Sequence, residues 1–220
     1  MSAVSAALLG FLLGLKHATD ADHVVAVTTI VSRERSFGRA ARIGALWGLG
    51  HSVTVIVIGG ALVVFRLAMP PRLGLGLEFV VAMMLILLGF TNLRDEHARG
   101  TTGDSAALPR GATWRPLVVG IVHGLAGSAA VALLVLAAIP QTTWALAYLM
   151  VFCAGTVGGM VVVTWLIAAP GVYAARHVAG FQRGIRLAAG VLSLVFGLVM
   201  AREVIVEGGL FRTTPTWTPR

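Results

Sequence analysis

The sequence predicts an all-α integral membrane protein whose six transmembrane helices form two inverted repeats of three. Its composition is 57% hydrophobic and only 12% charged, whereas soluble domains contain about 25% charged residues. A helix needs about 20 apolar residues to cross the hydrocarbon core, and six runs approach or exceed that length. They extend roughly over residues 3–31, 43–65, 75–92, 117–139, 142–168 and 185–201.

The breaks between these runs have the composition of loops. They contain most of the arginines, the Pro70–Pro71 pair and a stretch rich in Gly, Asp, Ser and Pro at 100–111, which are ordinary turn signals. No break is long enough for a soluble domain, so we expect one transmembrane domain over residues 1–220. Its predicted parts are a first three-helix repeat (1–95), a cytoplasmic loop (96–115), a second repeat (116–206) and an extracytoplasmic tail (207–220).

The arginines predict the orientation. Eleven fall in the first, third and fifth loops, and five fall on the opposite side. The positive-inside rule therefore places the odd-numbered loops in the cytoplasm and both termini outside. The same scatter argues against nucleic acid as the partner of the net +8 charge, because no soluble basic face forms. Cys153 is the only cysteine, which excludes an internal disulfide or a CxxC redox pair.

A weak internal repeat appears when the second half is laid over the first at an offset of about 106 residues. Gly14 and His17 then align with Gly120 and His123, and the later spans follow in the same order. Because each half has three crossings, the second half must enter from the opposite face. Inverted repeats are typical of transporters, in which one half rocks against the other around a midplane site.

The stretch HATDADH, residues 17–23, lies in the middle of the first apolar run. An ionisable side chain at this depth costs about 2.5–3.5 kcal/mol on insertion scales, so His17, Asp20, Asp22 and His23 need partners or a wet cavity. Imidazole and carboxylate together are the ligands of a divalent first-row transition metal. Such an ion would also neutralise the carboxylates.

Helix geometry limits how these residues can share one ion. At about 100° per residue, Asp22 and His23 lie about 140° and 240° around the axis from His17. Either the helix is unwound or bent near 19–22, as in the discontinuous helices of transporters, or the residues serve partners on different helices. His17 and Asp20, three positions apart, share a face.

Two further histidines lie in apolar spans beside small residues. His51 follows Gly48 and Gly50, and His123 precedes Gly124 and is the repeat mate of His17; small residues permit close helix approach. Three spans that each offer a histidine at similar depth favour one shared polar site. His97 and His177 fall in arginine-bearing loops and are expected to be solvated, and Glu78, at the start of the third run, is expected to be interfacial.

Two motifs give this pattern a family resemblance. His17-x4-Asp22-His23, preceded by the basic Lys16, resembles the HX4DH motif of the nickel/cobalt transporter (NiCoT) family, and residues 49–52, LGHS, resemble the motif on that family's next helix. The resemblance implies uptake of Ni²⁺, with Co²⁺ as the second candidate, through the cytoplasmic membrane. It also implies that the ion is substrate rather than permanent cofactor, and that a cytoplasmic nickel carrier or urease or hydrogenase maturation proteins are partners.

The second half departs from the larger family members. Their LGxDTATE stretch corresponds to residues 124–130, which are without acidic residues, and their GMxxxD corresponds to 159–164, where Thr164 replaces Asp. Those members also have eight spans. The chain is therefore more similar to the short, urease-accessory-type nickel permeases.

The hypothesis assigns two sets of site residues. His17, Asp22, His23 and His51 are the expected metal ligands. Asp20 is expected to hold a ligating histidine or to pair with Lys16, because metal-bound imidazoles usually donate their other N–H to a carboxylate or carbonyl. The remaining supporting or pathway residues are Lys16, Ser52, His123 and Thr164.

Three other functions are compatible with the sequence. An intramembrane zinc-dependent hydrolase also uses three His or carboxylate ligands and an activated water, with Ser52 and Asp20 available for catalysis. A permease could export a divalent metal instead of importing it. A membrane scaffold for metalloenzyme maturation would not need the buried histidines at all.

Overall fold

A computed structural model describes residues 3–32, 34, 36–67, 69–102, 114–125, 139, 141–174 and 181–217. Within these residues the chain is helical, without strands. The helices, in chain order, are α1 (Ala3–His17), α2 (Ala21–Val31), α3 (Phe37–Val64), α4 (Pro71–Thr102), α5 (Arg115–His123), α7 (Thr142–Ala174) and α8 (Phe181–Arg202), followed by the π-helical turn η2 (Glu203–Glu207).

Four helices of the described ranges, α3, α4, α7 and α8, are long and apolar enough to cross a bilayer. Large apolar side chains such as Val57, Leu87 and Leu166 point outward, as expected of surfaces that face lipid. The predicted all-helical membrane protein is therefore confirmed in its class. The first predicted run is divided into the shorter apolar helices α1 and α2, and much of the fourth run, 126–138, lies outside the described residues.

The helix that contains the third predicted run, α4, is longer than the apolar run itself. It was expected to end at Asn92, but α4 continues to Thr102. His97, which was expected in a loop, therefore lies on a helix, where it is exposed as predicted. Polar residues continue the helix here because Glu96 is buried against α8, where its carboxylate accepts two hydrogen bonds from Arg186 (2.6 and 2.8 Å).

The other end of α4 is covered by the C-terminal tail. The indole N–H of Trp217 donates to Glu78 Oε1 at 2.9 Å, and Glu78 is only 4% exposed. The expectation that Glu78 is interfacial was based on its position near the start of the span, and hydropathy could not reveal the aromatic cover supplied by residue 217. Arg186–Glu96 therefore ties one end of α4 to α8, and Trp217–Glu78 ties the other end of α4 to the tail that follows α8.

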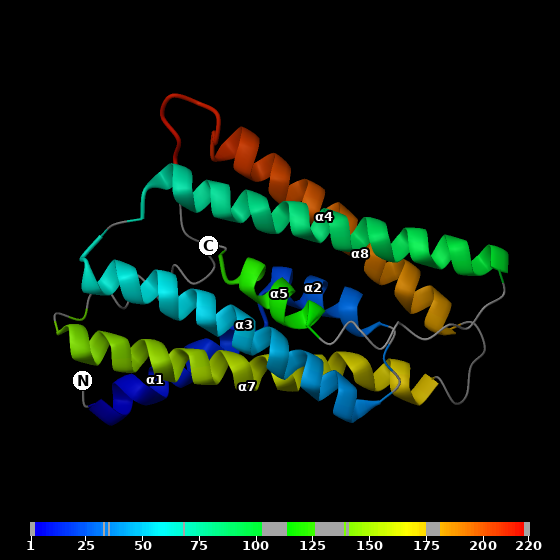
Figure 1. Ribbon diagram of the computed structural model, residues 1–220, viewed down its shortest axis with the longest axis horizontal. Helices are drawn as coiled ribbons and strands as arrows, with labels where there is room; N and C mark the ends of the chain where they lie inside the picture. Colours follow the sequence, from blue (N-terminus) through cyan, green and yellow to red (C-terminus); the bar gives the residue numbers. More distant parts are fainter. Residues whose placement is uncertain are drawn as a thin grey trace.

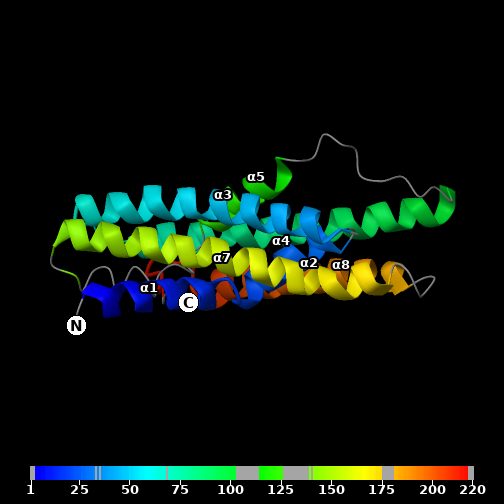
Figure 2. The same ribbon diagram turned by 90° about the horizontal axis from the view of Figure 1, so that it is seen from below.

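The most extensive helix contacts pair α3 with α7, α4 with α8, α1 with α7 and α3 with α5. In Figure 1, α4 and α8 lie together along one side of the molecule, and α1, α3 and α7 lie along the other. Figure 2 shows α1, α3 and α7 stacked side by side. Between the two groups lies α2, which contacts α4 and α8 as well as α3 and α7.

Glycines permit the closest of these approaches. A Cβ at Gly14 of α1 would meet the carbonyl oxygen of Phe152 in α7, and one at Gly155 of α7 would meet the carbonyl oxygen of Phe11 in α1. Because the obstructing atoms are backbone on both sides, neither contact can be relieved by a rotamer change. These contacts fix where α1 ends against the middle of α7.

The same arrangement joins α3 to α5. A Cβ at Gly50 would meet the carbonyl oxygen of Leu117, and one at Gly120 would meet that of Trp47. The end of α5, at His123, is thereby held against the middle of α3. Both short helices therefore end at mid-length of a long one.

We expect Gly155→Ala to destabilise the protein, because the added methyl group meets the backbone of α1. Overpacking of this kind costs about 1–3 kcal/mol. Gly158→Ala, one turn further along α7, is the matched control, since nothing lies within 4 Å of a Cβ there. Thermal unfolding of the detergent-purified protein, followed by size-exclusion fluorescence, should show a lowered midpoint for Gly155→Ala alone. Equal midpoints for the two variants would contradict the close packing of α1 on α7.

Candidate metal site

The site begins where the first predicted span is interrupted. α1 ends at His17, and α2 begins at Ala21 after the extended Asp20 (φ −61°, ψ 147°). Thr19 N–H and Asp20 N–H bond back to the carbonyls of Lys16 and His17 in a tight turn. Asp and Thr favour such a break because their side chains bond to nearby groups in place of the helix ladder. Of the two arrangements that the sequence left open, the structure has the interrupted helix.

The Asp20 side chain bonds to His17 instead of capping α2. His17 Nδ1 donates to Asp20 Oδ2 at 2.8 Å, and no side-chain cap bond forms. A carboxylate that accepts from Nδ1–H fixes the imidazole tautomer, so the lone pair of Nε2 can bind a metal. Lys16, in the last turn of α1, is exposed.

One group of three histidines converges beyond this break. His17 Nε2 lies 3.2 Å from His51 Nε2, and the His23 ring lies 4.6 Å from His17 and 5.1 Å from His51 between centroids. All three side chains are buried, and one ligand atom from each lies within 4.8 Å of the others. They come from α1, α2 and α3, so the interruption brings together residues that a continuous helix would separate.

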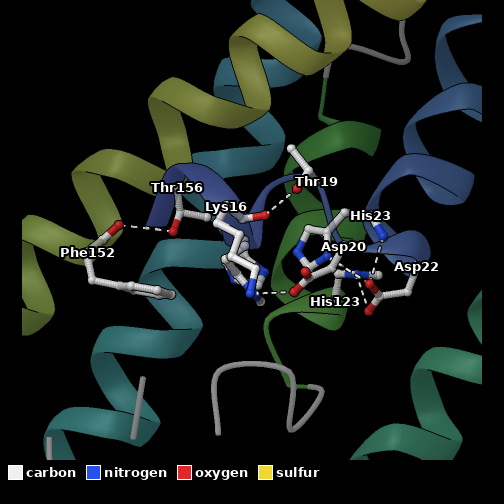
Figure 3. Close-up of polar contacts among 10 residues, drawn as sticks. Lys16, Thr19, Asp20, Asp22, His23, His123, Phe152 and Thr156 are labelled. Carbon is white, nitrogen blue, oxygen red and sulfur yellow. Dashed lines mark hydrogen bonds and ion pairs between the residues drawn. The ribbon is translucent and has the colours of Figure 1, made fainter. Parts of the chain in front are cut away.

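A second group forms beside the first from Asp22, His23 and His123. Asp22 Oδ1 lies 3.0 Å from His23 Nδ1, and Asp22 Oδ2 lies 3.2 Å from His123 Nε2. His123, the last residue of α5, lies 3.3 Å through its Nε2 from His23 Nδ1. Figure 3 shows Asp22, His23 and His123 gathered at one point between the helices. This group also meets the 4.8 Å criterion, and it adds the carboxylate.

Several nitrogens in these groups are buried without a hydrogen-bond partner among the described residues. They are His23 Nε2, His51 Nδ1 and His123 Nδ1. A buried polar atom left unsatisfied costs about 1–3 kcal/mol, and neutral imidazole nitrogens are the commonest protein ligands of transition metals. Four histidines and a carboxylate near the middle of α3 are therefore ligands for a divalent cation. Buried without such an ion, the same groups would be unfavourable.

Sequence reasoning missed two aromatic residues that line this site. The Trp47 ring lies 5.6 Å from both His23 and His123, and the Phe152 ring lies 5.5 Å from His17. Thr156, fully buried, donates its hydroxyl to the Phe152 carbonyl, as drawn in Figure 3. The spacing of four residues between Trp47 and His51 places them on one face of a helix, and this signal could have identified Trp47.

The remaining predicted residues lie further from the two groups. Ser52 is buried, and its hydroxyl donates to the Cys153 carbonyl of α7 at 3.4 Å. Thr164 is buried against Gly44, seven residues along α3 from His51, which corresponds to two helical turns. Ser52 therefore contributes to the α3–α7 contact, and Thr164 is not brought to the histidines.

The chain resembles known proteins along nearly all of its length. Residues 3–93 match the family model NicO, described as high-affinity nickel-transport protein. Urease accessory protein UreH of Bacillus sp. (strain TB-90) is 34% identical over 214 residues, 93% of each chain. A high-affinity nickel transport protein of Cupriavidus necator is 37% identical over 68 residues, 30% of this chain and 19% of that protein. No solved structure matches.

A more distant relative is the chloroplast protein FOR GROWTH AND FERTILITY 1 of Arabidopsis thaliana, 26% identical over 179 residues that cover 71% of this chain and 48% of that protein. The match to UreH spans both halves of the chain, and the NicO match contains the interrupted helix, Asp22, His23 and His51. The chain therefore belongs to the NicO family of nickel transporters, which are not enzymes, and within it is similar to the urease accessory protein UreH.

Proposed function

We propose that this protein is a permease that takes up Ni²⁺, with Co²⁺ as a second substrate, across the cytoplasmic membrane. The observation that carries this proposal is the presence of two buried groups of metal-ligand side chains that share His23. They lie at mid-length of the long helices. A dication reaching this depth must exchange water for other ligands, and neutral imidazoles together with one carboxylate offer them. Membership of a nickel-transport family supports the choice of metal.

His17, Asp22, His23 and His51 are proposed as ligands of the transported ion. Asp20 is proposed to position His17, since its carboxylate accepts the hydrogen bond from His17 Nδ1–H and leaves Nε2 facing His51 at 3.2 Å. With its side chain 40% exposed, Asp20 also offers an approaching cation its first negative charge. Lys16, exposed on the same turn, would be displaced toward solvent by that cation because the two charges repel.

We infer that the chain consists of two inverted repeats with six crossings. Glycine contacts on α1 and α5 support this inference because they repeat with the partners exchanged. Gly14 meets α7 at Phe152, and Gly120 meets α3 at Trp47; the offsets are 106 residues (14 to 120) and 105 residues (47 to 152). Such reciprocity is expected when a pseudo-two-fold axis relates the halves.

Contacts between α4 and α8 repeat in the same way. A Cβ at Gly89 would lie 2.7 Å from the Gly190 carbonyl, and one at Gly197 would lie 2.9 Å from the Ala82 carbonyl. Both offsets are 108 residues (89 to 197 and 82 to 190). The inferred parts are residues 1–95, the cytoplasmic loop 96–115, residues 116–206 and the extracytoplasmic tail 207–220, with both termini outside.

The repeat alone suggests that one half of the chain rocks against the other. The packing supports a different division into moving parts. If the halves rocked as bodies, the glycine contacts between α1 and α7 and between α3 and α5 would have to separate. We therefore propose that α1, α3, α5 and α7 move together against the α4–α8 pair, around α2. Delivery to a cytoplasmic nickel carrier or to urease or hydrogenase maturation proteins would follow on the inner side.

Alanine at His17, Asp22 or His23 is expected to reduce Ni²⁺ uptake to below about a tenth of the wild-type rate, because each removes a donor that replaces hydration. The measurement is radioactive nickel accumulation in cells at matched membrane expression, with Co²⁺, Zn²⁺ and Mn²⁺ as competitors. His97→Ala, which changes an exposed histidine on α4, is the control and should transport normally. Normal uptake by all three site variants would leave the proposal without support.

Asp20→Asn is expected to raise the KM for Ni²⁺ about tenfold while changing the maximal rate little. An amide is a weaker acceptor for His17 Nδ1–H, and outer partners of ligating histidines are worth about 10- to 100-fold in affinity. Asp95→Asn, on the exposed surface of α4, serves as the matched carboxylate control in the same vesicle assay. An unchanged KM for Asp20→Asn would show that Asp20 does not position His17.

A further inference from the structure

We propose that the ion occupies two successive positions that share His23, and that the second position is formed by Asp22, His23 and His123. This inference rests on the proposed transport of a divalent metal. It assigns His123, which neither family motif contains, a direct ligand role. The first position is the one between His17, His23 and His51.

The two donor groups overlap only at His23. Each brings three ligand atoms within 4.8 Å of one another, and among the described residues no larger group meets that limit. The His51 and His123 rings are 6.2 Å apart between centroids, whereas His23 lies 5.1 Å from His51 and 4.2 Å from His123. One ion therefore cannot be shared equally by all five side chains, and His23 belongs to both groups.

The His23 ring offers one nitrogen to each side. Its Nδ1 lies 3.0 Å from Asp22 Oδ1 and 3.3 Å from His123 Nε2, so Nδ1 serves the second position. Its Nε2 is buried without a hydrogen-bond partner among the described residues, and it is the nitrogen left for His17 and His51. A histidine so placed can release an ion on one side while binding it on the other.

His17 and His123 occupy equivalent places in the fold. Each is the last residue of a short helix, α1 or α5, which is held by glycine contacts against the middle of a long helix of the other half. Each ion position thus takes one helix-ending histidine, the first from the N-terminal half and the second from the C-terminal half. This arrangement matches the requirement of alternating access, in which one position opens to each side of the membrane.

Movement between the positions is a ligand exchange. Metal–nitrogen bonds to His17, His51 and His23 Nε2 break, and bonds to Asp22, His123 and His23 Nδ1 form. As the ion binds Nδ1, the proton on that nitrogen passes to water, and as the ion leaves Nε2, that nitrogen takes a proton from water, so the ring remains neutral and no net proton is consumed. Two dications sharing one imidazole would repel strongly, and the positions are therefore filled in turn.

The test measures binding and transport in the same set of variants: His51→Gln, His123→Gln, the double variant, and His97→Gln as the exposed-histidine control. The probe is Co²⁺ alone. Its binding to the purified full-length chain is measured by calorimetry and by the visible absorption of the bound ion. Each single variant should still bind one Co²⁺ with a Kd within about tenfold of wild type and with an altered spectrum. The double variant should bind more than about a hundredfold more weakly, and both single variants should lose uptake.

A double variant that binds Co²⁺ as well as His51→Gln alone would overturn the second position, as would normal uptake by His123→Gln. If His123→Gln fails to fold, Asp22→Asn tests the same position from α2 and carries the same expectations. Failure of the wild-type protein to accumulate nickel would instead remove the proposed function. The two hypotheses therefore fail on different measurements.

Discussion

The structure depends on the burial of imidazole and carboxylate groups at mid-length of its helices. Five such side chains lie within two overlapping groups, in surroundings where each would be unfavourable alone. The interruption after His17 makes this possible because α1 can end with its histidine pointing at His51 while α2 presents Asp22 and His23 from a new direction. A continuous helix would turn some of these groups toward lipid.

The glycines allow the short helices that carry these groups to end inside the bundle. A short helix that ends inside a membrane leaves carbonyl groups unpaired, and close packing against a long helix excludes lipid from that end. Gly14 and Gly155 bring α1 onto α7, and Gly50 and Gly120 bring α5 onto α3. The α4–α8 pair, tied by Arg186 and Glu96, contributes no residue to either donor group, and in the proposed motion it is the part against which the other helices move.

Much of this could be predicted from the sequence, and the reasons for the misses are physical. Composition and the long apolar runs gave the membrane class, and the angular scatter of residues 17, 22 and 23 gave the interruption as one of two alternatives. Histidines on three spans predicted a shared polar site that includes His123, but its direct approach to His23 joins positions 100 residues apart, and no local pattern encodes which side chain it contacts. Burial of Glu96 and Glu78 likewise depends on Arg186 and Trp217, which lie far away in the chain. Hydropathy therefore misplaced the end of α4 and the surroundings of Glu78.

The position of Trp47 gives the protein an internal optical reporter. Its indole lies 5.6 Å from the rings of both His23 and His123, while Trp114, Trp144 and Trp165 are exposed on the surface and Trp217 lies in the tail. Paramagnetic ions quench indole fluorescence at short range. An ion bound beside His23 would therefore quench Trp47, one of the five tryptophans. The ion's stay in the membrane could then be timed by native fluorescence, without attaching a dye.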